Sequence, residues 1–125
     1  MSIYREFVLS SGLSIKAGRD AVTNDSLVEE SNPNDILLHT LDPGSPFVNV
    51  GESPGKMEIK EAAIFCALKS QAWRDTKKDI GVNWFHKKNT TKDKRDKAGT
   101  WHTKHQEKII VKKGDILKLE KELAA

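Results

Sequence analysis

Short runs of apolar and β-branched residues, separated by turn-forming residues, make up the N-terminal part of the chain. The runs cover residues 4–9, 13–17, 36–39 and 47–50. Ser, Gly, Asn, Asp and Pro residues fill the gaps between them, and this pattern is typical of strands joined by turns. We therefore predict four strands here, the first two of which form a β-hairpin.

Residues 57–75 carry the strongest helical periodicity. One apolar stripe consists of Ile59, Ala62, Ala63, Cys66, Ser70 and Trp73, and a second consists of Ile64, Phe65, Leu68 and Ala72. A helix that is apolar around most of its circumference is buried from two sides, so we predict a long central helix. A short helix is predicted over residues 21–30, with Thr23 or Asn24 as its N-cap.

The C-terminal third contains two further apolar runs and a polar segment between them. Residues 82–85 read as a strand, and residues 87–99 contain no apolar side chain larger than that of an alanine, which predicts a flexible basic loop. Residues 107–112 and 116–119 flank a Lys-Gly-Asp turn, which predicts a closing hairpin. The expected fold is a single α+β domain over residues 1–125, with a mostly antiparallel sheet.

The composition is that of a small globular protein. A chain of 125 residues can bury a sufficient core without disulfides or metals. The single cysteine, Cys66, has apolar neighbours, which favours a buried thiol in a reducing compartment over a nucleophile. Neither a secretory signal nor an apolar stretch of about 20 residues is present, so we expect a cytoplasmic protein with no membrane segment.

Charge is distributed unevenly along the chain. Residues 77–113 hold 12 Lys and Arg against 4 Asp and Glu, a net charge of +8, whereas the whole chain has a net charge of +3. A basic block of this kind favours binding to a polyanion. Two tryptophans lie in the block, and aromatic rings can stack on unpaired bases while cations contact phosphates. The alternatives are a solvated loop, a membrane surface or an acidic protein partner.

The block supplies most of the predicted nucleic-acid contacts, which are Trp84, Lys87, Lys88, Lys92, Lys94, Arg95, Lys97, Trp101 and Lys104. Elsewhere, Arg19 follows a strand end and either binds a phosphate or pairs with an aspartate. His39 is either a structural residue or a base or phosphate contact. Ser45 in a turn and Lys56 at a helix start both have donors suited to an anion, although each is also explained by local structure.

No pattern in the chain predicts a cofactor, a nucleotide-binding P-loop or a metal site. A second hypothesis is a nucleic-acid-processing enzyme that uses Arg19, Asp20, His39 and Asp42 as acid and base groups. It requires these side chains to converge in one cleft. A third is a basic scaffold for protein interaction.

Several segments, in this order, resemble the NFACT-R domain, the RNA-binding module of the NFACT family. The matching residues are Phe7-Val-Leu-Ser-Ser-Gly-Leu-Ser-Ile15, Gly18-Arg19-Asp20-Ala21 with Asn24 and Leu27-Val28, Asp35-Ile-Leu-Leu-His39, Pro43-Gly44-Ser45-Pro46-Phe47-Val48, Glu61-Ala62-Ala63, Ser70-Gln-Ala-Trp73, Gly99-Thr100 and Ile110-Val-Lys-Lys-Gly114. The family includes ribosome-quality-control factors and short stand-alone members. The other segments of the full-length proteins do not fit in 125 residues.

The resemblance implies a stand-alone, non-catalytic RNA-binding module. The RNA expected from it is ribosomal or transfer RNA, and the expected partners are the ribosome or an RNA-modifying enzyme acting in trans. DNA is not distinguished from RNA by phosphate contacts alone.

Overall fold

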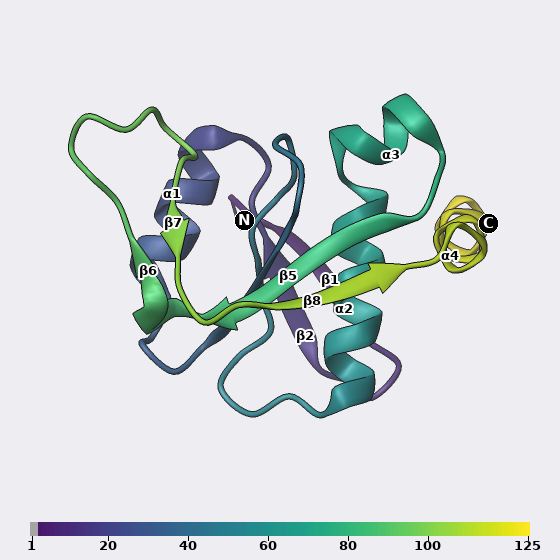
Figure 1. The fold of residues 1–125 in the computed structure, drawn as a ribbon. Coiled ribbons are helices and arrows are strands. Elements are labelled where there is room, and N and C mark those ends of the chain that lie inside the picture. Colours follow the sequence, from purple (N-terminus) through teal and green to yellow (C-terminus); the bar gives the residue numbers. More distant parts are fainter. Residues whose placement is uncertain (1–2) are drawn as a thin grey trace.

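The computed structural model describes residues 3–125, so the first two residues of the predicted domain lie outside the described part (Figure 1). The strands are β1 (Arg5–Val8), β2 (Ser14–Ala17), β3 (Ile36–Thr40), β4 (Val48–Asn49), β5 (Ile80–His86), β6 (Thr90–Thr91), β7 (His102–Thr103) and β8 (Glu107–Val111). The helices are α1 (Ala21–Glu30), α2 (Lys56–Leu68), α3 (Gln71–Thr76), the 3-10 turn η1 (Lys87–Asn89) and α4 (Lys113–Ala124).

Six of the strands form one antiparallel sheet in the order β1-β2-β4-β3-β5-β8. β1 and β2 form the predicted hairpin, in which Phe7 is opposite Ile15. β6 and β7 form a separate two-stranded ribbon, which lies beside α1 at the left of Figure 1. The α+β class and the antiparallel sheet are therefore as predicted.

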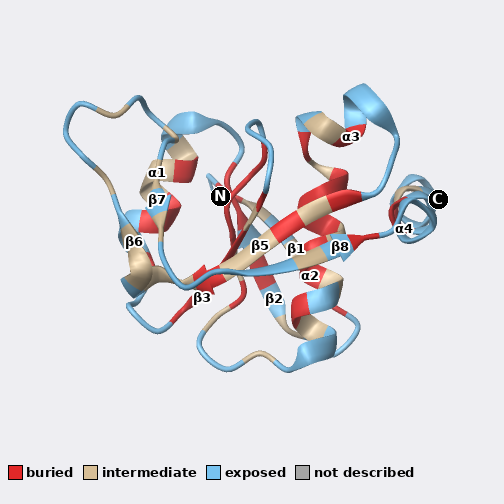
Figure 2. Cartoon of the chain, viewed as in Figure 1, coloured by how far each residue is buried: buried red, intermediate tan, exposed pale blue. Residues whose placement is uncertain are grey.

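The sheet separates two apolar cores. Successive side chains of a strand point to opposite faces, and β5 follows this rule. Val82 enters the main core with the residues of α2, whereas Phe85 enters a second core with Leu27 and Val28 of α1. Buried residues concentrate in the central strands and in α2 (Figure 2). Helices thus cover both faces, with α2 and α4 on one face and α1 on the other.

The predicted central helix over residues 57–75 is wrong as a single element, because it is interrupted between α2 and α3. Ser70 lies in the break with an extended backbone. Its hydroxyl donates to the carbonyl of Ala67 at 2.6 Å and accepts from the N–H of Trp73 at 3.2 Å, so it caps the start of α3. Capping is the role in which serine stabilises helices best. The break turns the chain and gives α3 a direction of its own.

The predicted closing hairpin is also wrong in its second half. β8 forms as expected, but residues 113–124 are helical and form α4. The carboxylate of Asp79 accepts from the backbone N–H of Lys113 at 2.8 Å, which satisfies one of the free N–H groups at the start of this helix. Ile116 and Leu119 are buried against the main core, and α4 lies at the right-hand end of the molecule in Figure 1.

The thiol of Cys66 is fully buried in the main core, as predicted. Burial raises its pKa to about 12, so the thiol is protonated at neutral pH. Within residues 3–125, every helix is too short or too polar to cross a membrane.

Candidate nucleic-acid interface

A cleft of about 670 Å³ opens on the face of the sheet that α1 covers only in part. Its walls come from β1, the β2–α1 connection, the turn that follows β3, α3 and the segment that leads into β7. Four cationic side chains line it: Arg5, Arg19, Lys69 and Arg74. The only acidic residue among the described lining residues is Asp20. We call this feature the arginine cleft.

Arg19 is placed by the start of α1. The N-cap of this helix is Asp20, not the predicted Thr23 or Asn24. The carboxylate of Asp20 accepts from the N–H of Thr23 at 2.8 Å, and the Thr23 hydroxyl in turn accepts from the N–H of Arg19 at 2.7 Å. This reciprocal cap fixes the backbone on both sides of Arg19 and leaves its side chain exposed.

Gly18 allows the chain to pass very close to α1. A Cβ atom at this position would lie 1.9 Å from Oδ1 of Asn24, which no side chain could tolerate without movement. That Oδ1 atom accepts from the N–H of Phe47 at 3.0 Å, while the N–H of Gly18 donates to the Phe47 carbonyl at 3.0 Å. Gly18, Asn24 and Phe47 therefore hold together the two connections that bring Arg19 and the post-β3 turn to one site.

Arg74 reaches the cleft because α3 is attached to the same turn. The N–H of Gln71 donates to the carbonyl of Gly44 at 2.8 Å. Gly44 has a φ of +88°, a conformation that glycine adopts readily, and a Cβ atom there would lie 2.8 Å from Cβ of Gln71. The Gln71 side chain also accepts from the Arg74 guanidinium at 2.9 Å.

The three arginines form a concentrated positive centre. Burial lowers the pKa of Arg5 below its ordinary value, and the charges of Arg19 and Arg74 lower it further. An arginine nevertheless remains protonated in proteins. Among the described residues, no carboxylate oxygen lies within 4.0 Å of any of these guanidinium groups, so the Arg19–aspartate pair, one of the two alternatives for Arg19, is absent there. An anionic ligand is the natural partner for such a group of unpaired cations.

His39 and Ser45 line the same cleft with different roles. The Nδ1–H group of His39 donates to the carbonyl of Thr40 at 2.7 Å, and burial lowers the pKa of His39. The ring is therefore neutral at pH 7 and is not a phosphate-binding cation. The Ser45 hydroxyl accepts from the N–H of Thr40 and donates to the carbonyl of Pro46, so its hydrogen is already used inside the turn.

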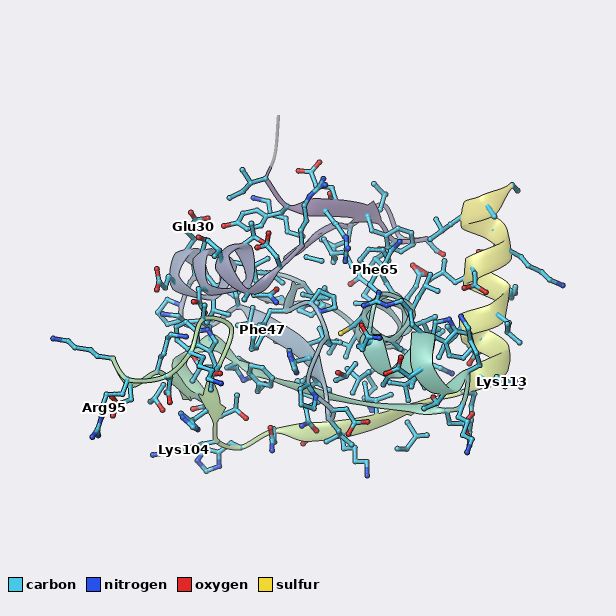
Figure 3. All side chains as sticks on the ribbon, turned by 90° about the horizontal axis from the view of Figure 1, so that it is seen from above. Glu30, Phe47, Phe65, Arg95, Lys104 and Lys113 are labelled. Carbon is cyan, nitrogen blue, oxygen red and sulfur yellow. The ribbon has the colours of Figure 1, made fainter. Side chains whose placement is uncertain are left out.

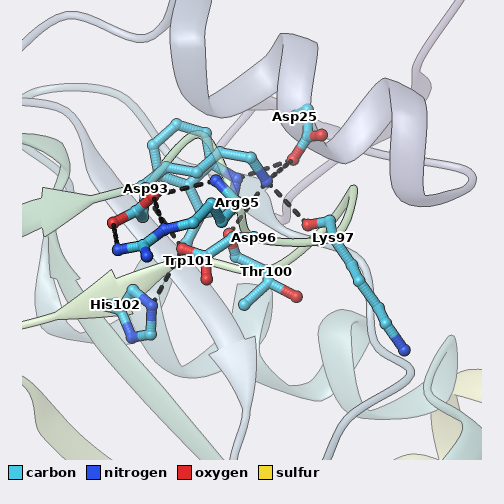
Figure 4. Close-up of polar contacts among 9 residues, drawn as sticks. Asp25, Asp93, Arg95, Asp96, Lys97, Thr100, Trp101 and His102 are labelled. Atoms are coloured by element: carbon cyan, nitrogen blue, oxygen red, sulfur yellow. Dashed lines mark hydrogen bonds and ion pairs between the residues drawn. The ribbon is translucent and has the colours of Figure 1, made fainter.

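Residues 87–104, which we call the basic segment, form one wall of the cleft and are held by a single carboxylate. Oδ1 of Asp25 accepts from the N–H of Gly99 at 2.9 Å, the indole N–H of Trp101 at 2.9 Å and Nζ of Lys92 at 3.1 Å. Figure 4 shows Asp25 of α1 together with Trp101 and the neighbouring residues of the segment. Lys92 also donates to the carbonyls of Lys97 and Thr100, at 3.0 Å in each case. Its ammonium group is thus fully hydrogen-bonded within the protein and orders the segment.

The other cations of the segment lie on its outside. Lys88 approaches Asn34 at 3.4 Å, and Arg95 pairs with Asp93 at 3.4 Å. Arg95 and Lys104 point outward at the end of the molecule opposite α4 (Figure 3). The predicted cations Lys87, Lys94 and Lys97 belong to the same stretch but do not line the cleft. These side chains surround the wall as a diffuse positive region.

Two predicted contact residues lie elsewhere. Trp84 is directed to the main core, on the face of the sheet opposite the core that Trp101 contacts, so the two rings do not share a stacking surface. Lys56 is the first residue of α2 and does not line the cleft. The helix start beside it is occupied by the protein itself, because Glu58 accepts from the N–H of Gly55 at 2.9 Å.

The acid and base groups of the enzyme hypothesis do not all converge. Arg19, Asp20 and His39 line the cleft, whereas Asp42 does not. Hydrogen bonds from the backbone and hydroxyl of Thr23 hold the pKa of Asp20 below its ordinary value, as expected for a carboxylate that caps a helix. Across residues 3–125, no three His, Cys, Asp or Glu side chains gather in a way that could hold a metal ion.

The comparisons with known proteins decide the family. The model of the NFACT protein RNA binding domain matches residues 3–114. The chain belongs to the NFACT RNA-binding domain family. It is therefore an RNA-binding module, in a family defined by RNA binding and not by catalysis. The family match confirms the resemblance seen in the sequence and ends near the start of α4.

A solved structure shows the same fold. The C-terminal part of the fibronectin/fibrinogen-binding protein from Streptococcus suis superposes with a TM-score of 0.81 and 18% sequence identity. The match covers 94% of this NFACT-R domain and 49% of the other chain, so the domain corresponds to about half of that structure. At this identity the likeness shows the fold alone. A search of curated proteins gives no match.

Sequence reasoning missed three of the cations in the cleft, Arg5, Lys69 and Arg74. Each looks like an ordinary surface charge in its own segment. Arg5 was placed on a predicted strand and Arg74 near the end of a predicted helix, but only the hairpin pairing and the break at Ser70 bring them beside Arg19.

Proposed function

We propose that this domain binds RNA at the arginine cleft, where Arg5, Arg19 and Arg74 contact phosphate groups. The observation that carries the proposal is the convergence of three guanidinium groups from separate elements, without a carboxylate partner among the described residues. The planar guanidinium group donates two parallel hydrogen bonds to a phosphate, which makes arginine well suited to this contact.

The outer lysines are proposed to act at longer range. Lys87, Lys88, Lys94, Arg95, Lys97 and Lys104 surround the wall that the basic segment adds to the cleft. Exposed cations accelerate the approach of a polyanion and add affinity that depends strongly on salt. In this division of roles, the lysines attract the RNA and the arginines fix its position.

The proposed RNA is ribosomal or transfer RNA, bound in the cytoplasm. The domain would then work beside the ribosome, in quality control, or beside an RNA-modifying enzyme that acts in trans. The support for this part is the family to which the chain belongs. Recovery of crosslinked RNA from cells, followed by sequencing, tests it directly, and enrichment of messenger RNA alone would contradict it.

The RNA-binding site is tested with charge-matched variants. Arg19→Gln and Arg74→Gln each remove one cation from the cleft, and Lys118→Gln removes one from the exposed face of α4. Fluorescence anisotropy with single-stranded RNA across a salt series should give about tenfold weaker binding for each arginine variant. The slope of log affinity against log salt should fall by about 0.7 for each lost phosphate contact.

Lys118→Gln is the control and should leave both the affinity and the slope close to those of the wild type. Equal effects for all three variants would show that binding depends on net charge and not on the cleft. A DNA strand of the same sequence distinguishes RNA from DNA. Binding of an acidic protein in place of either nucleic acid would support the scaffold hypothesis and contradict this proposal.

A further inference from the structure

The floor of the arginine cleft carries two polar side chains that lie side by side. His39 on β3 and Asn83 on β5 are direct partners across neighbouring strands, and both line the cleft. Directly opposite residues on one face of a sheet have Cβ atoms about 5 Å apart. Both side chains are half-buried, so they are accessible only from the cleft.

The His39 ring is oriented by the protein and has one free acceptor. Its Nδ1–H donates to the Thr40 carbonyl at 2.7 Å, and it contacts the ring of Phe47, with centroids 4.5 Å apart and the two planes tilted by 40°. Because a carbonyl oxygen can only accept, Nδ1 of His39 carries the hydrogen in this contact, and the neutral imidazole then keeps a lone pair on Nε2. That atom can accept a hydrogen bond from a ligand in the cleft.

The Asn83 side chain has both a donor and an acceptor available. Within the described residues its side-chain amide makes no hydrogen bond, and Asn83 lines the cleft. An asparagine amide can pair with a nucleobase edge through two hydrogen bonds, because both groups present a donor beside an acceptor. The cleft floor therefore offers hydrogen bonds that suit a flat heterocycle better than a second phosphate.

The size of the cleft is compatible with one nucleotide. Its volume of about 670 Å³ is in the range of small-molecule sites. Cationic side chains line it together with the polar floor, and Trp101 adds aromatic surface to the wall. Single-stranded RNA is commonly recognised by bases that leave the stack and enter such sites.

Building on the proposed RNA-binding function, we propose that the arginine cleft holds a single unpaired nucleotide of an RNA strand. The base pairs with the Asn83 amide and donates to Nε2 of His39, while the adjoining phosphate lies on Arg5, Arg19 and Arg74. Uracil has a single N–H donor, which cannot serve both the Asn83 side-chain oxygen and Nε2 of His39, so a base with an exocyclic amino group is preferred.

The first experiment observes the two ends of the cleft separately. The full chain, labelled with ¹⁵N, is titrated with adenosine 5′-monophosphate, uridine 5′-monophosphate and inorganic phosphate, and side-chain signals are followed by NMR. Inorganic phosphate should shift the Nε–H signals of Arg5, Arg19 and Arg74 and leave the side-chain amide of Asn83 unchanged. The adenine nucleotide should also shift the side-chain amide of Asn83, and do so at lower concentration than the uracil nucleotide.

The second experiment separates base contacts from phosphate contacts in an RNA strand. Asn83→Ala should weaken binding of a single-stranded adenine-rich RNA about tenfold and leave the salt slope unchanged. Arg74→Gln should reduce both the affinity for the RNA and the slope of log affinity against log salt. Lys118→Gln again serves as the control, and thermal melting checks that each variant is folded.

The outcomes distinguish this inference from the proposed function. If the wild type binds RNA and loses affinity in Arg74→Gln but not in Asn83→Ala, phosphates bind at the cleft and the nucleotide inference is wrong. An Asn83 amide signal that stays unchanged with every nucleotide, while RNA still binds, also overturns it. If the wild type binds no RNA at low salt, the proposed function itself fails.

Discussion

The indole N–H of Trp101 donates a 2.9 Å hydrogen bond to the carboxylate of Asp25, joining the basic segment to α1. The two residues are 76 positions apart in the chain. The same carboxylate oxygen also accepts from Gly99 and Lys92. The Asp25 side chain of α1 therefore fixes the position of the basic segment, which forms one wall of the arginine cleft.

Replacing Asp25 should release this wall. Asp25→Ala leaves the N–H groups of Gly99 and Trp101 without their partner, and unpaired groups of this kind cost about 1–3 kcal/mol of stability. Urea unfolding measures the loss, and hydrogen exchange at Gly99 should accelerate. Asp93→Ala is the control, since its partner Arg95 is exposed and the loss of stability should be much smaller than for Asp25→Ala. Equal effects in the two variants would contradict the anchoring role of Asp25.

The same carboxylate should make the stability of the domain depend on acid pH. Burial acts to raise the pKa of Asp25, but hydrogen bonds from Gly99, Lys92 and Trp101 outweigh it and hold the pKa below its ordinary value of 3.8. A carboxyl group whose pKa is lowered in the folded state stabilises the fold fully when the pH is above the group's ordinary pKa. This stabilisation is lost as the pH falls through the folded-state pKa. The free energy of unfolding in urea should be larger for the wild type than for Asp25→Asn at pH 7. The difference between the two free energies should become smaller below about pH 4. A gap that is constant with pH would show that charge is not involved.

Adding a methyl group at Gly18 should disturb both the fold and the RNA site. The new Cβ atom would overlap Oδ1 of Asn24, which is held by a hydrogen bond from Phe47. Overpacking of this kind costs about 1–3 kcal/mol, and the shift displaces the neighbouring Arg19. Gly114→Ala is the matched control, because nothing lies within 4 Å of its Cβ position and it is inside α4. That change should stabilise the domain by about 0.4–1 kcal/mol, and a melting temperature that falls in both variants would argue against a specific clash.

Removing the hydroxyl of Ser70 should loosen α3. Ser70→Ala deletes the N-cap and leaves the N–H of Trp73 unpaired, at a cost of about 1 kcal/mol. Because Arg74 is on α3, the affinity for RNA should fall with the stability. Thr76→Ala removes an exposed hydroxyl that bonds to the Ala72 carbonyl and should change stability by less than about 0.5 kcal/mol. Unfolding curves that coincide for Ser70→Ala and the wild type would exclude the capping role.

Elements with a local pattern could be predicted from the sequence, and those set by tertiary contacts could not. The β1–β2 hairpin follows from two strand-like runs and a compact turn, and α1 has the predicted bounds, although its N-cap is Asp20. The interruption at Ser70 is invisible to periodicity, because Trp73 stays in phase with the apolar stripe of α2. Lys-Gly-Asp at residues 113–115 resembles a turn, but burial of Ile116 and Leu119 favours a helix there.

The candidate site was predictable only in part, for a similar reason. Arg19 and His39 were identified because each stands at a change of local structure. The polar neighbour of His39 on the next strand, Asn83, could not be identified without the strand register. Lys92 was expected to contact RNA, but the carboxylate that it meets inside the protein comes from a distant helix. Charge runs show how much positive charge is available, and only the fold shows which charges are free.

Because Arg5, Arg19 and Arg74 come from parts of the chain that are far apart, the group exists only while the whole domain is folded. A denatured molecule or an isolated peptide of residues 77–113 keeps the +8 charge of that segment but has no such group. Binding experiments with fragments of the chain would therefore measure general attraction to polyanions and would miss any selectivity that the arginine cleft has for its RNA. Unfolding the domain therefore removes binding at the arginine cleft and keeps the general attraction between its positive charges and a polyanion, with no change in amino-acid composition.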